Sequence, residues 1–366
     1  MKSYFAKFWK KLSKERGNTF FRKVDRYVGI FLLFFLSFFR KKKSFPKQIK
    51  KIGIIKLAGI GDTVLLARSI YALRKKFPKM EIFFFSGKAN YEIASLLAVD
   101  KVIVLSPFSC KNAVQKLSKE NLDVLIDAEP WSRISAIFTY FSKAKFTIGF
   151  MSKRQFKHFC FDRIAKHQKN RHELENGFSL FEVFQLEKPL EYDFQTKREN
   201  SPEKIVVFHP CPGGSSVEYR KWPKSYWRKL FSYFQDTEYK IYVTGSKSDY
   251  LVNAEIFEDL PVINIAGKLS VQETAQFLRK AKCIISVNTG IMHLAGALNL
   301  PTFCLHGPTN PNRWGAVGKN VYSFSPLQSG HFCLHLGYEK ICPKCRCMDQ
   351  ILPEKVFAKI KPVLSL

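Results

Sequence analysis

The sequence is poor in acidic residues relative to basic ones. Thirty Asp and Glu stand against sixty Lys and Arg among 366 residues, which gives a formal net charge of +30. Such an imbalance implies a polyanionic partner, and nucleic acid, an anionic membrane surface and a phosphorylated glycolipid all qualify. No nucleic-acid-binding motif accompanies the charge, so we expect no nucleic-acid partner.

A long apolar run is also missing. Residues 27–39 (YVGIFLLFFLSFF) form an apolar stretch of thirteen residues, whereas a membrane-spanning helix needs about 20. Residues 1–51 contain sixteen Lys and Arg but only two acidic residues, Glu15 and Asp25. We therefore expect residues 1–50 to form a basic, apolar helical extension that associates with a membrane surface. A helix packed on the first domain and a single membrane span are the alternatives.

Cysteines are few, and their number, nine, is odd. No cleavable secretory signal opens the chain, so we expect reduced thiols in the cytosol. Four cysteines near the C-terminus lie close together and include a CPKC motif: Cys333, Cys342, Cys345 and Cys347. Reduced structural thiols are the preferred interpretation, and a structural zinc site or a redox role are the alternatives.

The remainder of the chain shows a strand–helix alternation that occurs twice. Strands are expected at residues 52–57, 81–86, 101–105, 123–127, 205–209, 240–244, 283–287 and 302–305. Helical spacing of apolar residues follows several of them, which predicts parallel sheets covered on both faces. We therefore predict an α/β protein with two Rossmann-like domains, at residues 51–198 and 199–366, that face a cleft.

Three loops of this pattern have the chemistry to bind a nucleotide diphosphate. Residues 59–62 (GIGD) place Asp62 at the start of the first helix. Residues 213–216 (GGSS) supply backbone N–H groups and two hydroxyls, and Arg220 follows them. Residues 288–290 (NTG) open a helix that carries His293. Helix starts and glycine-rich loops bind anions, although each loop alone could be an ordinary cap or surface turn.

Several blocks resemble glycosyltransferase family 9, the heptosyltransferases of the lipopolysaccharide core. They are KIGIIKLAGIGDTVLLARSIYALRKKFP from residue 51, HPCPGGSSVEYRKWP from residue 209, and the run from Ala266 to Pro308 with its AGK, TGxxHLAxA and GPTxP elements. The resemblance covers roughly residues 51 to 366. It implies the GT-B architecture, transfer with inversion and no metal cofactor for transfer.

The resemblance also assigns roles to individual residues. It implies that Asp62 is the catalytic base and that a donor-binding set holds the nucleotide sugar. That set consists of Ser215, Ser216, Arg220, Asp249, Asn288, Thr289, Gly290 and His293. Arg220 stands where the family usually has Lys. Asn288 stands where many members have Asp, a residue associated with sugar contacts, so another hexose or heptose is the alternative to heptose as the donor sugar.

The resemblance implies heptose transfer from ADP-heptose to an anionic, lipid A-linked inner-core acceptor. Such an enzyme would be cytoplasmic and peripheral on the inner face of the inner membrane, with the membrane surface as a partner. The alternatives are a family member that uses another nucleotide sugar and a non-catalytic glycan-binding or scaffold relative.

Overall fold

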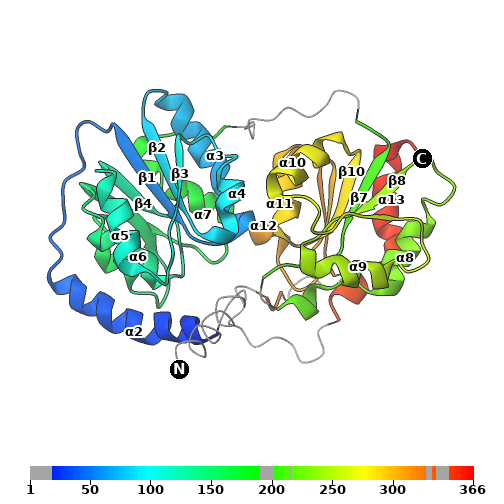
Figure 1. Ribbon diagram of the computed structural model, residues 1–366, viewed down its shortest axis with the longest axis horizontal. Coiled ribbons are helices and arrows are strands. Elements are labelled where there is room, and N and C mark those ends of the chain that lie inside the picture. The colour runs from blue at the N-terminus through cyan, green and yellow to red at the C-terminus, as the bar shows by residue number, and fades with distance from the viewer. Residues whose placement is uncertain (1–18, 190–201, 215, 327–331, 335–345) are drawn as a thin grey trace.

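The computed structural model describes residues 19–189, 202–214, 216–326, 332–334 and 346–366. These residues form two α/β halves that lie side by side, with helices α3 (Ile60–Lys76) and α11 (Gly290–Ala297) between the two sheets (Figure 1). The predicted boundary between residues 198 and 199 lies outside the described residues.

Each half is built on a six-stranded parallel sheet. The first has the order β3-β2-β1-β4-β5-β6 and the second the order β12-β11-β10-β7-β8-β9. In each half the first strand along the chain pairs with the second and fourth, the order of a Rossmann fold, so the predicted fold class and GT-B architecture are confirmed. Ligands bind such sheets where the strand order reverses, which here is beyond β1 and β4 and beyond β7 and β10.

The strands of the first sheet are β1 (Lys51–Lys56), β2 (Glu81–Ser86), β3 (Lys101–Val104), β4 (Val124–Asp127), β5 (Phe146–Met151) and β6 (Arg163–Lys166). The strands of the second sheet are β7 (Ile205–His209), β8 (Lys240–Val243), β9 (Ile263–Asn264), β10 (Cys283–Val287), β11 (Thr302–Leu305) and β12 (Val321–Phe324). Central strands such as β7 and β10 are buried along their whole length, which is why they appear in the sequence as continuous apolar runs.

Helices cover both sheets. In the first half these are α3, α4 (Tyr91–Ala94), α5 (Cys110–Lys119), α6 (Arg133–Phe141), α7 (Glu173–Ser179) and the 3-10 segments η1 (Lys88–Asn90), η2 (Lys157–Cys160) and η3 (Glu182–Phe184). In the second half they are α8 (Lys224–Ser232), α9 (Tyr250–Ile256), α10 (Val271–Lys280), α11, α12 (Pro311–Trp314), α13 (Pro353–Leu364) and the 3-10 segments η4 (Val217–Arg220), η5 (Lys247–Asp249) and η6 (Met348–Gln350).

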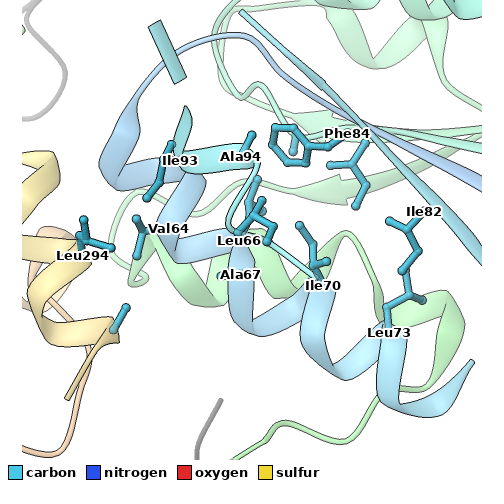
Figure 2. Packing of buried hydrophobic residues seen from close by; sticks show 14 of the residues in the cluster. Val64, Leu66, Ala67, Ile70, Leu73, Ile82, Phe84, Ile93, Ala94 and Leu294 are labelled. Carbon is cyan, nitrogen blue, oxygen red and sulfur yellow. The ribbon is translucent and has the colours of Figure 1, made fainter. Parts of the chain in front are cut away.

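One apolar cluster joins the halves. Val64 and Leu66 of α3 and Leu294 of α11 are buried in the same core as the first sheet's Ile82 and Phe84. Figure 2 shows Leu294 beside Val64, at the end of the row of α3 side chains that packs on the sheet. The two halves are therefore in direct apolar contact along α3 and α11.

Helix α2 (Thr19–Phe38) packs on the outside of the first half, where it contacts α6 and η2 (Figure 1). Leu33 is fully buried in a cluster with Ala136 and Phe161, and Leu36 is 7% exposed. This is the arrangement that the sequence left as an alternative to membrane attachment, and attachment itself stays a prediction. Within the described residues, no helix combines the length and hydropathy needed to cross a bilayer.

Candidate active site

The predicted base lies in the first turn of α3, directly after β1. Nζ of Lys56, the last residue of β1, lies 3.1 Å from Oδ2 of Asp62 and 3.2 Å from Oε2 of Glu129. The Lys56 and Glu129 side chains are only 4% and 8% exposed, whereas the Asp62 side chain is 42% exposed. The structure thus places the accessible carboxylate of Asp62 next to the buried ion pair of Lys56 and Glu129.

Glu129 also holds the loop that carries Asp62. Its Oε1 accepts hydrogen bonds from the backbone N–H of Leu57 at 2.7 Å and of Ala58 at 3.2 Å. Burial alone would lower the pKa of the Lys56 ammonium, but the Asp62 and Glu129 carboxylates raise that pKa above its usual range. Lys56 therefore stays charged and keeps both carboxylates in place.

A second buried ion pair supports this edge of the sheet. Nζ of Lys157 lies 3.0 Å from Oδ2 of Asp127, and both side chains are fully buried. The same ammonium donates to the carbonyls of Glu129 and Ser132, which fixes the loop between β4 and α6. Because Glu129 lies in that loop, the Lys157 contacts also position the Glu129 carboxylate. We refer to this carboxylate as the clamp on the Asp62 loop.

In the second half, Arg220 closes the loop that begins at the end of β7. Its guanidinium donates to the carbonyl of Asn288 at 2.9 Å and to that of Gly213 at 2.5 Å. Burial lowers the pKa of Arg220 to about 10, so it is still a cation at pH 7. Ser216 lies in this loop in a left-handed conformation, with φ of 56°, and Ser215 lies outside the described residues. The structure thus brings the predicted Arg220 and Asn288 together.

The amide of Asn288 binds two side chains of the next loop. Its Nδ2 donates to Oγ1 of Thr309 at 3.0 Å and to Nδ1 of His306 at 3.1 Å. Burial lowers the pKa of His306 to about 3, so the ring is neutral and can accept this hydrogen bond. An amide suits this place because it donates to both acceptors, which an ionised Asp cannot do.

The start of α11 meets the Asp62 loop at two glycines. The Thr289 hydroxyl caps α11 by accepting from the N–H of Met292 at 3.4 Å. A Cβ added to Gly290 would lie 2.7 Å from Cβ of Ile60, and one added to Gly61 would lie 2.6 Å from Cδ2 of His293. The two loops can approach so closely only because neither position carries a side chain.

His293 lies buried against Gly61 at this contact. Its exposure is 5%, and burial lowers its pKa to about 4. The ring is therefore neutral at pH 7, and we find it packed between the halves. The structure brings Asp62, Thr289, Gly290 and His293 to one interface, as the sequence predicted for loops facing a cleft.

Asp249 has a local structural role. Its Oδ2 accepts hydrogen bonds from the N–H of Ser246 at 2.7 Å and from its hydroxyl at 2.6 Å, which caps η5. The carboxylate packs over Gly245, because a Cβ there would lie 3.2 Å from Oδ2. Its expected contact with ribose stays a prediction.

Half of the cysteine cluster lies beyond the described residues. Cys333 and Cys347 are partly buried, whereas Cys342 and Cys345 are outside. Among the residues that the structure describes, no group of three or more His, Cys, Asp or Glu side chains could hold a metal ion.

Polar contacts also link the halves beside this site. Arg313 of α12 binds Oε1 of Glu173 on α7 with Nε and a terminal nitrogen, both at 2.8 Å, and the two side chains are 3% and 9% exposed. Nε2 of His172 lies 3.1 Å from the carbonyl of Gly315. These contacts hold the loop after β6 against the second half.

Sequence reasoning missed Lys56, Glu129, His306 and Thr309. Lys56 gave a usable signal, because a lysine inside the apolar run IGIIKL must find a carboxylate once the strand is buried. Glu129, His306 and Thr309 gave none, because each is defined by a partner that is distant in sequence.

Comparison with known proteins decides the family. The model of glycosyltransferase family 9 (heptosyltransferase) matches residues 111–335, more than half of the chain. The chain belongs to glycosyltransferase family 9. Membership of this family confirms the resemblance, and the chain is a glycosyltransferase.

Individual family 9 proteins are similar over most of the chain. Lipopolysaccharide heptosyltransferase 1 of Escherichia coli strain K12 is 23% identical over 295 residues, which cover 74% of this chain and 92% of the relative. The structure of E. coli heptosyltransferase WaaC with ADP has a TM-score of 0.70 at 20% identity and covers 86% of this chain and 99% of that one. WaaC with ADP-2-deoxy-2-fluoro heptose has a TM-score of 0.67 at 20% identity, covering 85% and 99%. At these identities the solved structures establish the common fold.

Proposed function

We propose that this family 9 enzyme transfers heptose from ADP-heptose to an anionic, lipid-linked acceptor of the lipopolysaccharide inner core, with inversion at the anomeric carbon. One observation carries the proposal: an accessible carboxylate, Asp62, lies in the loop whose Ile60 and Gly61 meet the start of α11 at the interface of the two halves. The names of the relatives support heptose and lipopolysaccharide, and the WaaC complexes support ADP-heptose as donor.

In the proposed reaction, Asp62 accepts the proton of an acceptor hydroxyl while that oxygen attacks the anomeric carbon. The new carbon–oxygen bond forms as the bond from the anomeric carbon to the phosphate oxygen breaks, and the electron pair leaves with ADP. Lys56 orients the Asp62 carboxylate, and Glu129 offsets the charge of Lys56. The Asp62 carboxylate thus lies beside the ion pair of Lys56 and Glu129, whose charges cancel, rather than beside an unpaired cation.

The donor diphosphate would bind to the second half. Arg220 supplies a cation, Thr289 and Gly290 open a helix whose N-terminus favours anions, and Ser215 and Ser216 supply hydroxyls. We assign Asp249 to the ribose, and Asn288 and His293 to the segment beneath the sugar and diphosphate. Because these groups already provide positive charge and donors, we propose that transfer needs no metal; structural zinc at the cysteine cluster is a separate prediction.

The enzyme would act at the inner face of the inner membrane, from the cytoplasm. The proposed nucleotide-sugar donor is charged and water-soluble, whereas the proposed acceptor is anchored in lipid, so the enzyme has to reach the membrane surface. The +30 charge suits an anionic surface and a phosphorylated acceptor.

A thermal-shift panel tests the donor. ADP, UDP, GDP and their sugars, including ADP-heptose and ADP-glucose, are added at low and physiological salt. A ligand at 100 times its Kd stabilises a protein by about 2.7 kcal/mol, so selective stabilisation by ADP and ADP-heptose is expected. Stabilisation by another nucleotide sugar would overturn heptose, and no response to any of them would support a non-catalytic protein.

A further inference from the structure

Helix α2 is apolar on two opposite faces. One face, with Gly29, Leu33 and Leu36, packs on the first half. The opposite face is exposed, and we refer to it as the α2 aromatic face. It consists of Tyr27, Val28, Phe31, Leu32, Phe34, Phe35 and Phe38, together with Phe39 directly after the helix. A surface helix normally turns polar residues outward, so this face requires a cover of its own.

The exposure of this face is large. Phe31 is 76% exposed and Phe38 is 71% exposed, and neighbouring rings pair along the helix, with Phe34 and Phe38 at 5.0 Å between centroids. The elements beneath α2 add further exposed rings: Phe141 at the end of α6, and Phe156 and Phe159 at η2, each between 44% and 45% exposed. Helices that lie in a membrane interface bury Phe, Trp and Leu side chains at the boundary between the lipid headgroups and the acyl chains.

The basic run that follows α2, residues 40–43, contains residues with two different roles. Arg40 binds Oδ2 of Asp162 at 2.6 Å with both side chains at most 9% exposed, and Nζ of Lys43 donates to the carbonyl of Ala144 at 2.8 Å. These two residues fasten the end of the helix to the first half. Lys41 and Lys42 lie between them and are exposed. The aromatic face therefore has positive charge at its end, which attracts anionic lipid.

Asp25 fixes the other end of the helix beside the candidate active site. Its Oδ1 accepts from the backbone N–H of Arg133 and of Ile134, each at 2.9 Å, and so caps α6. The residues just before α6 form the loop that carries Glu129, the clamp on the Asp62 loop. Helix α2 is thus attached, near its N-terminus, to the carboxyl end of the first sheet, where Asp62 lies.

We propose that the α2 aromatic face lies flat on an anionic lipid bilayer and holds the Asp62 edge of the first half at that surface. This inference rests on the proposed function for the identity of the lipid-linked acceptor, and on the exposed rings and Lys41 and Lys42 for the membrane contact. A helix with one face packed on protein lies in the interface rather than across it. Residues 27–39 would extend roughly 20 Å along the surface at about 1.5 Å per residue.

Vesicle co-sedimentation of the full chain tests the proposal. The vesicles contain phosphatidylglycerol and phosphatidylethanolamine, or phosphatidylcholine alone, and no acceptor. The test variant is Phe31→Gln with Phe38→Gln, and the matched control is Leu251→Gln with Ile263→Gln, whose side chains are 78% and 40% exposed on the second half. We expect the test variant to bind anionic vesicles at least about tenfold more weakly, because two inserting rings are lost, and the control to bind like the wild type.

Charge supplies a second measurement. Lys41→Gln with Lys42→Gln should weaken binding to phosphatidylglycerol vesicles, by roughly 1 kcal/mol per lysine on general grounds, or about fivefold each, and should flatten its salt dependence. Unfolding temperature and ADP response of each variant establish that the fold is intact.

Three results would overturn the proposal. The wild type could stay in the supernatant with anionic vesicles, or the Phe31 and Phe38 variant could bind like the control. A change from dimer to monomer in that variant, without a change in vesicle binding, would assign the face to a second copy of the chain. Failure of the proposed function is distinguishable, because it would leave vesicle binding intact while ADP-heptose neither binds nor reacts.

Discussion

The two halves meet at the candidate active site with different electrostatics. The first half presents carboxylates that are held by buried lysines, in the pairs of Lys56 with Glu129 and Lys157 with Asp127. The second half presents neutral histidines and an arginine whose hydrogen bonds to two backbone carbonyls orient it without cancelling its charge. The difference separates two tasks: a positioned base on one side and a site for a diphosphate on the other.

Among changes to the first half, removal of the base should have the largest effect on the rate of transfer. We expect Asp62→Ala to lower kcat by about 100- to 10,000-fold, the usual contribution of general base catalysis. Donor affinity should stay nearly unchanged, because the donor set lies on the second half. Steady-state transfer and calorimetric titration with ADP measure the two quantities. A collapse of donor binding in this variant would contradict the division of tasks.

Removing the lysine beneath the base should cost stability. Lys56→Met leaves Glu129 buried without its cation, for which we expect a loss of about 3–5 kcal/mol in the free energy of unfolding. The control is Lys224→Met, since Lys224 pairs with Glu258 at 3.6 Å with side chains 41% and 66% exposed, and such exposed pairs contribute about 0–1 kcal/mol. Urea denaturation compares the two variants. Equal losses would show that the buried pair of Lys56 and Glu129 contributes no more to stability than an exposed pair.

On the second half, loss of Arg220 should weaken binding of the donor. Arg220→Gln should reduce affinity for ADP by about 1.5–3 kcal/mol, the range for hydrogen bonds to charged groups, while the fold persists. Lys221→Gln is the neighbouring control, because Lys221 pairs with Glu218 on the surface. If both variants bound ADP like the wild type, the diphosphate would have to bind elsewhere.

The histidines of the second half should make it sensitive to acid. Burial lowers the pKa of His209 and His293 to about 4 and that of His306 to about 3, whereas an unfolded histidine titrates near pH ~6.5. Below that pH the unfolded chain binds protons that the folded chain does not. Stability is therefore complete above pH ~6.5 and falls as pH decreases toward 4, by roughly 1.4 kcal/mol per pH unit for each histidine.

Denaturation curves between pH 7.5 and 5 measure this slope. The variant His209→Asn should reduce the slope by one histidine, since His209 lies at the end of β7 with Nδ1 2.8 Å from Oγ1 of Thr244. An unchanged slope in that variant would show that another group governs the acid response.

The sequence predicted eight of the twelve described strands, including the edge strand β3, and missed β5, β6, β9 and β12. The predicted strands at residues 81–86, 205–209, 283–287 and 302–305 match β2, β7, β10 and β11, because strands buried on both faces consist of unbroken apolar residues. The outer strand β6 has mostly exposed side chains, and β9 has only two residues. Such strands form because a neighbour offers its backbone, so their own residues carry little signal.

The candidate site was predictable to the extent that it depends on local chemistry. Asp62 lies shortly after β1, and Thr289 and Gly290 lie shortly after β10, so the fold places each at the carboxyl end of its own sheet, where ligands bind. The clamp by Glu129 was not predictable, because it joins residues about seventy positions apart. The amide contacts of Asn288 likewise required the loop after β11 to be in place.

The cap that Asp25 forms on α6 has a consequence for the biosynthesis of the chain. The two partners are 108 residues apart, so at about 5–20 residues per second the ribosome needs roughly 5–22 s to complete α6 after α2 has been made. During that interval the face of α2 with Leu33 is without its protein partner, so both apolar faces of the helix are uncovered. We therefore expect the nascent chain to bind holding chaperones, or to be delivered early to the lipid surface on which the finished enzyme would work.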